Sequence, residues 1–258
     1  MLAKQAVDRP DRDAAPSVDP AEVEKFDSIA EEWWNPDGPF RPLHRLTPIR
    51  LAYLRDRIGD HFGRDVGGER LFAGLSAVDI GCGGGLVSEP LARLGLAVTG
   101  VDPGANNIAS ARAHAAGQGL AIDYRAGTPE DLAAAGNRYD VVLALEIVEH
   151  VADRRAFIGT CAELARPGGL LIVSTINRTA KAFVLAIVGA EYVLRWLPRG
   201  SHHWRKFVRP SELARDVRAC GARPIDTTGL VFDPLNNRWR LAADVDVNYF
   251  LTAHFERK

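Results

Sequence analysis

A short apolar segment that runs directly into a glycine-rich turn constrains the fold of this chain more than any other feature. Val78 and Ile80 belong to the segment, and glycines follow at positions 81, 83, 84 and 85. Because glycine lacks a Cβ atom, the backbone can adopt positive φ there and a bulky ligand can approach its N–H groups. Leucines at positions 86, 91 and 94 predict a helix after the turn. The order strand, turn, helix therefore predicts a ligand site at a helix N-terminus.

Length and composition favour a single large α/β domain of ordinary globular character. The chain has 258 residues, of which 47% are hydrophobic and 25% charged. A net charge of −1 argues against nucleic acid as a general partner. Three cysteines, far apart in the sequence, predict no disulfide framework and indicate a reducing cytosol. Residues 1–18 mix acidic and basic side chains with prolines, so we expect a disordered tail rather than a signal peptide.

Apolar segments alternate with helical patterns along most of the chain. Strands are expected, besides the first, at residues 97–102, 121–125, 139–145 and 170–175, and helices at residues 19–34, 49–62, 105–116 and up to 164. A turn is expected at residues 167–169, and a hairpin-like pair at residues 223–232 and 249–255. Alternation of this kind predicts βαβ units, a parallel sheet and ligands at the carboxyl ends of its strands.

The spacing of the glycines decides between two classes of cofactor. A dinucleotide fingerprint requires glycine at the first, third and sixth positions of the turn, but Leu86 occupies the sixth. Asp102, at the tip of the second strand, is placed to accept hydrogen bonds from ribose hydroxyls in either class, or else to cap the next helix. The compact glycine run fits the amino-acid tail of a ligand better than a pyrophosphate.

Three motifs together resemble the class I S-adenosylmethionine-dependent methyltransferases: residues 78–85, 100–102 and 167–169. Over residues 23–253 the chain resembles the ubiquinone-biosynthesis O-methyltransferases. The pieces that carry this resemblance are Trp33, Trp34, Gly38, Phe40 and residues 42–44, 146–150, 174–178, 189–192 and 247–249. Thr47, Leu145, Phe232 and Asp233 depart from the family pattern. The resemblance implies a Rossmann-like α/β fold with a mostly parallel seven-stranded sheet and helices on both faces. Residues 19–258 would form one domain, with a helical extension at 19–66 and an inserted helical lid at 178–209.

The resemblance also implies which residues contact S-adenosylmethionine: Arg50, Gly81, Asp102 and Leu145, to which the glycine turn adds Gly83. Arg50 would hold the methionine carboxylate as a bidentate partner. Without the motif around it, Arg50 would be interpreted as an exposed helix arginine.

The implied reaction is methylation of polyprenylated hydroxyphenols and catechols, namely 2-polyprenyl-6-hydroxyphenol and 3-demethylubiquinol. A phenol has a pKa of about 10, so a base or a Lewis acid must help remove its proton at neutral pH. Glu146, Glu149 and His150 stand at i, i+3 and i+4, and on a helix they would share one face. These three are the catalytic candidates.

The same three residues are candidate metal ligands, because the resemblance implies a magnesium ion that binds both catechol oxygens. Magnesium prefers oxygen ligands, however, and imidazole suits Mn, Fe, Co or Zn better. A metal-free alternative makes His150 a general base oriented by a glutamate, and a third interpretation is a solvent-facing helix start. Cys82 sits inside the tight turn, and direct methyl transfer requires no nucleophilic cysteine.

Residues 182–197 are apolar apart from Glu191 and Arg195, and too few to span a bilayer. Seven basic residues lie in or beside this insert: Arg178, Lys181, Arg195, Arg199, Arg205, Lys206 and Arg209. An apolar helix flanked by cations suits an interfacial membrane contact, each cation contributing roughly 1 kcal/mol at an anionic surface. A buried lid over the active site is the alternative. We expect a cytoplasmic bacterial protein at the inner face of the cell membrane, with other ubiquinone-biosynthesis proteins as further candidate partners.

Two hypotheses from other classes compete with this enzyme. A non-catalytic lipid- or quinone-binding module would keep the fold without methyl transfer, and a nicotinamide-dependent reductase would use the glycine turn for a dinucleotide. Leu86 disfavours the reductase. The binding module is disfavoured because the chain retains Gly81, Asp102, Glu146, Glu149 and His150 together.

Overall fold

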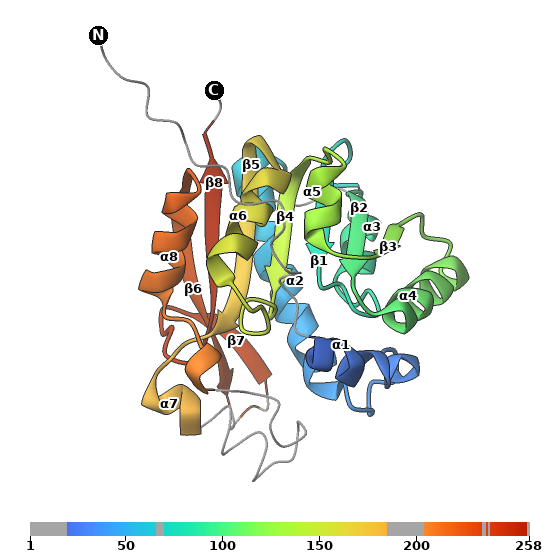
Figure 1. The fold of residues 1–258 in the computed structure, drawn as a ribbon, viewed down its shortest axis with the longest axis horizontal. Helices are drawn as coiled ribbons and strands as arrows, with labels where there is room; N and C mark the ends of the chain where they lie inside the picture. Colours follow the sequence, from blue (N-terminus) through green and yellow to red (C-terminus); the bar gives the residue numbers. More distant parts are fainter. Residues whose placement is uncertain (1–19, 66–69, 185–203, 234–235, 237, 257–258) are drawn as a thin grey trace.

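The computed structural model describes residues 20–65, 70–184, 204–233, 236 and 238–256 (Figure 1). Two expectations from the sequence, the disordered tail at residues 1–18 and most of the apolar helix at 182–197, lie outside these residues. The helices are α1 (Pro20–Asp27), α2 (Arg41–Phe62), α3 (Ser88–Arg93), α4 (Ala105–Gly117), α5 (Pro129–Ala134), α6 (Arg154–Leu164), α7 (Ala180–Ala182) and α8 (Pro210–Ala219). The described residues also form the 3₁₀ turns η1 (Ala30–Glu32) and η3 (Trp204–Lys206).

One mixed sheet runs through the molecule. Its strands are β1 (Ser76–Ile80), β2 (Ala97–Asp102), β3 (Asp123–Ala126), β4 (Tyr139–Leu145), β5 (Ala165–Ile176), β6 (Ala222–Asp233), β7 (Arg238–Ala242) and β8 (Asn248–Phe255). Their order is β3-β2-β1-β4-β5-β8-β6-β7. The first five are parallel neighbours, whereas β8, β6 and β7 pair antiparallel. This is the expected Rossmann-like class I methyltransferase architecture.

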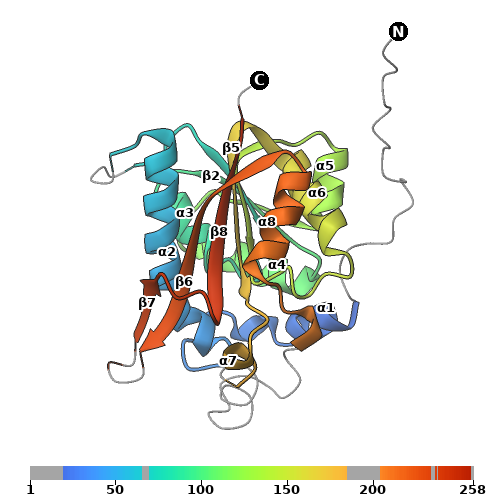
Figure 2. The ribbon, with the colours of Figure 1, turned by 90° about the vertical axis from the view of Figure 1, so that its left-hand side faces the viewer.

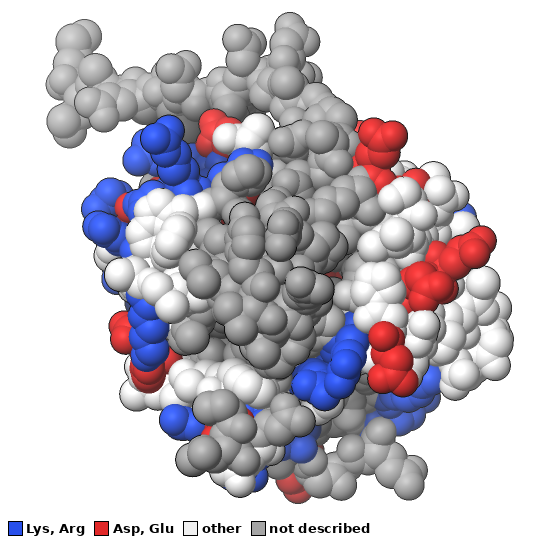
Figure 3. All heavy atoms as spheres, turned by 90° about the horizontal axis from the view of Figure 1, so that it is seen from below, with Lys and Arg blue, Asp and Glu red and all other residues white. Residues whose placement is uncertain are grey.

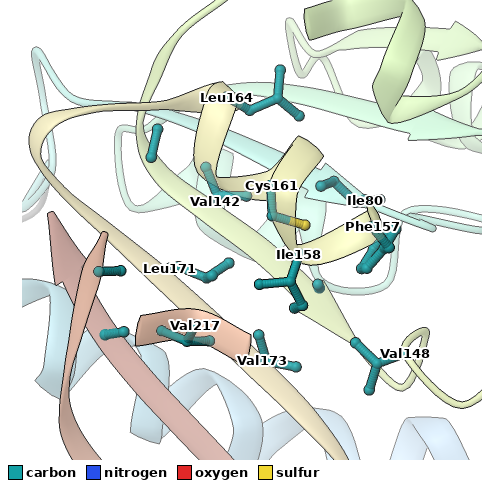
Figure 4. Close-up of a cluster of buried hydrophobic side chains, with 14 of the residues drawn as sticks. Ile80, Val142, Val148, Phe157, Ile158, Cys161, Leu164, Leu171, Val173 and Val217 are labelled. Carbon is teal, nitrogen blue, oxygen red and sulfur yellow. The ribbon is translucent and has the colours of Figure 1, made fainter. Parts of the chain in front are cut away.

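Helices cover both faces of the sheet, with α2 on one side and α6 and α8 on the other (Figure 2). The alternation of side chains along β4 explains both layers: Val141 and Leu143 pack with α2, whereas Val142 and Ala144 pack with α6. In the second layer, Phe157, Ile158, Cys161 and Leu164 of α6 and Val217 of α8 pack with Leu171 and Val173 of β5 and Val142 of β4 (Figure 4). A strand buried on both faces reads as a continuous apolar run, which is why β4 could be recognised from the sequence.

The N-terminal extension differs from the sequence-based expectation. Instead of one helix over residues 19–34, α1 ends at Asp27 and the chain tightens into η1. Instead of beginning near residue 49, α2 begins at Arg41, with Pro42 in its first turn and Pro48 inside it. Proline suits a first turn because that N–H group has no helical partner. At Pro48 the helix loses a single hydrogen bond, and the apolar packing of the long helix tolerates that loss.

The sheet contains eight strands in the described residues rather than the expected seven. The additional strand is β7, which forms an antiparallel hairpin with β6 at the edge of the sheet. As expected, β6 and β8 pair antiparallel, but β7 lies between them in the sequence. The turn expected at residues 167–169 is a register shift inside β5, because Ala165 already pairs with Tyr139 before the main ladder resumes at Leu170.

The carboxyl ends of the parallel strands meet at one edge of the sheet, the lower edge in Figure 1, where α1 and α7 also lie. The turns that follow β1, β2, β4 and β5 are therefore close together in space. None of the helices in the described part of the chain is long and apolar enough to cross a bilayer.

Candidate active site

The glycine turn after β1 is closed by its own hydrogen bonds. Gly81 has φ of +71° and donates its N–H to the carbonyl oxygen of Val101 at 2.8 Å. The positive φ favours glycine, and a Cβ atom at this position would lie 2.6 Å from Cδ1 of Ile147, so the end of that side chain would have to move. Gly83 donates its N–H to Oδ2 of Asp102 at 3.0 Å. Since both N–H groups have partners in the chain, a ligand at Gly81 would meet its carbonyl oxygen.

Asp102 ends β2 and is buried, with an exposed fraction of 8%. Besides Gly83, its carboxylate accepts hydrogen bonds from the N–H of Gly104 at 2.8 Å and from Nδ2 of Asn107 at 3.0 Å. Burial raises the pKa of Asp102, and these donors oppose that effect. A carboxylate has about four acceptor sites, so three internal hydrogen bonds leave room for a further donor such as a ribose hydroxyl.

Arg50 lies on α2 and is buried, with only 4% of it exposed. It is therefore not the exposed helix arginine that its local sequence alone would indicate. Its Nη2 lies 3.1 Å from Oε1 of Glu146, yet neither Nε nor Nη2 has a hydrogen-bond partner of suitable geometry. A buried guanidinium with unsatisfied N–H groups is costly unless a ligand completes it. These two nitrogens fit the carboxylate of an amino-acid ligand, which an arginine can bind in a bidentate manner.

Besides Asp102 on β2, a second carboxyl is buried on β1, that of Asp79. The sequence alone assigned it no role. Its Oδ2 accepts a hydrogen bond from Oγ of Ser88 at 2.6 Å. Burial raises the pKa of Asp79 to about 6, while Ser88 and the charge of Arg50 act in the opposite direction. The charge of Arg50 therefore favours the ionised form of Asp79. The signal in the sequence was an acidic residue inside an otherwise apolar strand.

The segment that follows β4 is a turn, not the expected helix, and α6 begins only at Arg154. Glu146 has φ of +54° and is the only non-glycine residue with positive φ in the described part of the chain. Its N–H donates to the carbonyl oxygen of Ser174 at 3.0 Å, and its Oε1 accepts from Oγ of Ser174 at 2.9 Å. Such a backbone costs of order 1 kcal/mol or more and is typical of functional sites.

Glu146 and Glu149 consequently point to opposite faces of the sheet. Ser174, the partner of Glu146, continues the α2-facing side of β5, as does Leu145 at the end of β4. Thr175 faces the α6 side and donates its Oγ1 to Oε2 of Glu149 at 2.8 Å. The turn therefore places the carboxylate of Glu146 on the α2 face of the sheet, where Arg50 lies, and the carboxylate of Glu149 on the α6 face.

Glu149 is buried, with 4% exposed. Burial is the main reason that the pKa of Glu149 rises from its ordinary value of 4.5 to about 7, and the negative charge of Glu146 adds to it. The charge of His150 acts in the opposite direction. A carboxyl with a pKa near neutrality is suited to accept a proton from a substrate at neutral pH. The solvent-facing interpretation of this segment is wrong for Glu149.

His150 is half-buried, and its ring contacts Phe26 of α1 edge-on, with centroids 6.1 Å apart. The described residues contain no group of three or more His, Cys, Asp or Glu side chains placed to hold a metal ion. Glu146 is engaged by Ser174 and Arg50, and Glu149 by Thr175, so the three side chains as placed do not form a three-ligand site. The metal hypothesis stays a prediction that rests on the sequence motif.

Two residues at the carboxyl edge had no role in the sequence-based site. Asn177, directly after β5, donates Nδ2 to the carbonyl oxygen of Val245 at 2.9 Å, while its buried Oδ1 has no hydrogen-bond partner. Trp33 packs against the glycine turn, where a Cβ atom at Gly83 would lie 2.3 Å from Cζ2 of the indole ring. The only sequence signal for Asn177 and Trp33 was that both lie in the motifs that resemble the ubiquinone-biosynthesis O-methyltransferases.

Comparisons with known proteins show the family and the fold of the chain. A family model described as methyltransferase domain matches residues 78–173. The chain is 55% identical to the ubiquinone biosynthesis O-methyltransferase of Chelativorans sp. over 237 residues, which cover 92% of this chain and 94% of the relative. It is 52% identical to that of Parvibaculum lavamentivorans over 250 residues, 97% of this chain and 99% of the relative.

Solved structures of the same fold include the magnesium protoporphyrin IX methyltransferase of Synechocystis with bound SAH. It has a TM-score of 0.58 and 20% identity, and the match covers 94% of this chain and 90% of that one. This likeness concerns the fold, whereas the curated relatives define the family. The nicotinamide-dependent alternative is therefore wrong, and the expected S-adenosylmethionine-dependent methyltransferase is confirmed. The chain belongs to the family of ubiquinone biosynthesis O-methyltransferases.

Proposed function

We propose that this enzyme transfers a methyl group from S-adenosylmethionine to a hydroxyl of a polyprenylated phenol or catechol in ubiquinone biosynthesis. The proposed acceptors are 2-polyprenyl-6-hydroxyphenol and 3-demethylubiquinol. The observation that carries the proposal is the turn after β4. On one side its Glu146 contacts a buried arginine with unsatisfied nitrogens, and on the other Glu149 has a pKa of about 7.

On the cofactor side, Arg50 would hold the methionine carboxylate through Nε and Nη2, and Asp102 would accept from the ribose. The ion pair with Glu146 orients the guanidinium before the ligand arrives, which lowers the entropy lost on binding. When bound, S-adenosylmethionine supplies an electrophilic methyl group on a sulfonium. The residues that hold it fix the distance and direction of attack, which is the main contribution a protein makes to such a displacement.

On the substrate side, Glu149 would accept the phenolic proton as the methyl group is transferred. A carboxylate whose pKa is about 7 is a stronger base than an ordinary glutamate, and it remains ionised above neutral pH. Thr175 fixes its orientation through the hydrogen bond to Oε2. We assign Asn177 a substrate contact, because its buried Oδ1 can accept a hydrogen bond from a second hydroxyl. His150 would line the same side beside Phe26.

The test is methyl transfer to a short-chain prenylated catechol, with the product identified by mass spectrometry. We expect Glu149→Gln to lower kcat by about 10²-fold to 10⁴-fold and to remove the rise of activity around pH 7. Glu149→Asp should keep that limb of the pH profile at a lower rate. Absence of any methylated product with wild-type enzyme would show that the proposed acceptor class is wrong.

We also propose that the insert at residues 178–209 contacts an anionic membrane surface. Its two described ends lie side by side, since the rings of Phe183 and Trp204 are 5.6 Å apart, and Phe183 and Val184 are exposed. Lys and Arg side chains are exposed on this face of the molecule, several of them on the side that carries α7 and α8 and others on the opposite side (Figure 3). Arg178 and Lys181 bind acidic partners, namely Glu212, Asp244 and Asp246, so counting basic residues overstates the free charge.

The membrane proposal predicts co-sedimentation with vesicles of anionic phospholipid that weakens as salt rises. Arg205→Glu should weaken it further, because Arg205 is exposed at the end of the insert. Arg138→Glu, an exposed arginine between α5 and β4, is the matched control. Complete recovery of the wild-type protein in the supernatant at low salt would contradict the proposal.

A further inference from the structure

A chain of hydrogen bonds links the N-terminal extension to the carboxylate at the end of β2. Nε1 of Trp33 donates to Oδ1 of Asn107 at 2.7 Å, and Nδ2 of Asn107 donates to Oδ1 of Asp102 at 3.0 Å. All three side chains are buried, with exposed fractions of 8%, 2% and 8%. Hydrogen bonds that are shielded from water in this way hold side chains in one orientation.

The direction of these hydrogen bonds follows from the chemistry of the groups. An indole N–H can only donate, so Trp33 selects the amide oxygen of Asn107. The NH₂ group of Asn107 must then face Asp102, whose carboxylate accepts it. The carboxylate of Asp102 can only accept, so it selects the same orientation of the amide, and the two hydrogen bonds of Asn107 reinforce each other. Without the indole N–H, the buried Oδ1 of Asn107 would lack its donor, and the amide that donates to Asp102 would be held from one side only.

Asp27 anchors the same segment to the first turn of α4. Its Oδ1 accepts from the N–H groups of Asn106 at 2.8 Å and Asn107 at 3.1 Å, and its Oδ2 accepts from Nδ2 of Asn106 at 2.9 Å. The N-cap residue of α4 is Gly104, which has no side chain to satisfy these donors. Asp27 on α1 therefore provides the cap from a distant part of the sequence.

The extension also packs directly on the glycine turn. The indole ring of Trp33 stacks on Phe40 with centroids 3.7 Å apart, and a Cβ atom at Gly84 would lie 2.4 Å from Cβ of Trp33. Trp34 donates its Nε1 to the carbonyl oxygen of Gly84 at 3.0 Å. The turn, the carboxylate and the extension are thus held as one unit.

We propose that Trp33 and Asn107 are positioning residues for the ribose of the cofactor, which act through Asp102. Binding of the ribose and packing of residues 26–40 on the glycine turn then stabilise each other. The inference rests on the proposed contact between Asp102 and the ribose. In this proposal the N-terminal extension increases the affinity for the cofactor without touching it.

The experiment compares Trp33→Phe with the wild-type enzyme and with Trp239→Phe, a control on the distant strand β7. Phenylalanine preserves ring packing on Phe40 but lacks the N–H group. Calorimetry would measure the Kd of S-adenosylhomocysteine and of its 2′,3′-dideoxy analogue. We expect Trp33→Phe to weaken S-adenosylhomocysteine binding by about 5-fold to 10-fold, the loss typical of one buried hydrogen bond, and to raise KM for S-adenosylmethionine without changing kcat.

The analogue distinguishes positioning from simple packing. Because it lacks the ribose hydroxyls, it should bind wild-type and Trp33→Phe enzymes with nearly equal affinity. An equal loss for both ligands would overturn the proposal and indicate that Trp33 acts through packing alone. Asp102→Asn tests the underlying contact separately: if it leaves S-adenosylhomocysteine affinity unchanged, the ribose role of Asp102 is wrong. Melting curves of each variant would show that it is folded.

Discussion

Glu149→Gln should make the folded enzyme more stable while it removes activity. The pKa of Glu149 rises from 4.5 to about 7 in the folded chain, chiefly through burial. Each pKa unit corresponds to about 1.4 kcal/mol, so the ionised carboxylate destabilises the folded state by about 3 kcal/mol. The sign follows from linkage: the folded state binds more protons than the unfolded state between these pH values, so stability falls as pH rises from about 4.5 to 7.

Glutamine has no charge to desolvate and can still accept the hydrogen bond from Thr175. At pH 8 we therefore expect the free energy of unfolding of Glu149→Gln to exceed that of wild type by up to about 3 kcal/mol, which corresponds to roughly 6 to 12 °C in Tm. At pH 4.5 the two proteins should have nearly equal stability. Ionisation of Asp79, whose pKa is about 6, also lowers the free energy of unfolding as pH rises. This contribution is the same in wild type and Glu149→Gln, so it cancels in the difference.

Urea unfolding followed by far-UV circular dichroism at pH 4.5, 6 and 8 would measure the difference. Glu163→Gln, an exposed glutamate on α6, is the matched control and should leave stability unchanged at every pH. A Glu149→Gln protein whose stability difference does not depend on pH would refute the reasoning. So would a variant that is less stable than wild type throughout.

Three further predictions concern the rest of the site. Arg50→Lys should weaken S-adenosylhomocysteine binding by about 10-fold or more in calorimetry, because an ammonium cannot reproduce the bidentate geometry; unchanged affinity would contradict the carboxylate contact. Dialysis against a chelator should leave turnover unchanged, because Glu146 and Glu149 bind Ser174, Arg50 and Thr175 instead; activity that is lost and then restored by Mg²⁺ or Mn²⁺ would support the metal hypothesis. Asp27→Ala should lower the free energy of unfolding by about 1 kcal/mol in urea through loss of the α4 cap, whereas Asp37→Ala, an exposed control, should not.

Much of the fold could be predicted because buried parallel strands leave a local signal. The continuous apolar run that became β4 has the predicted bounds, and the glycine turn and Asp102 lie where the alternation of elements places them. Strand β7 was missed because a five-residue edge strand with alternating arginines resembles a loop. The start of α2 was missed because its prolines argue against a helix, although they fit a first turn and a well-packed interior.

The geometry of the site was harder to predict, because it depends on partners far apart in the sequence. The spacing of Glu146, Glu149 and His150 indicates a helix, but hydrogen bonds to Ser174 hold Glu146 at positive φ and separate the two carboxylates. Burial of Arg50 follows from the packing of a whole helix, which no local pattern reveals. The bonds from Asp27 to the first turn of α4 join residues 79 and 80 positions apart.

Because Asp27 of α1 caps α4, the region around α4 depends on the N-terminal extension and is not an independent module. The methyltransferase family match spans residues 78–173, yet the guanidinium expected to bind the cofactor comes from α2 and the cap from α1. A shortened protein limited to the matched region would expose the first amides of α4 and leave Asp102 without its fixed neighbour. Recombination that exchanged only this region between relatives would therefore need a compatible N-terminal extension to keep cofactor affinity.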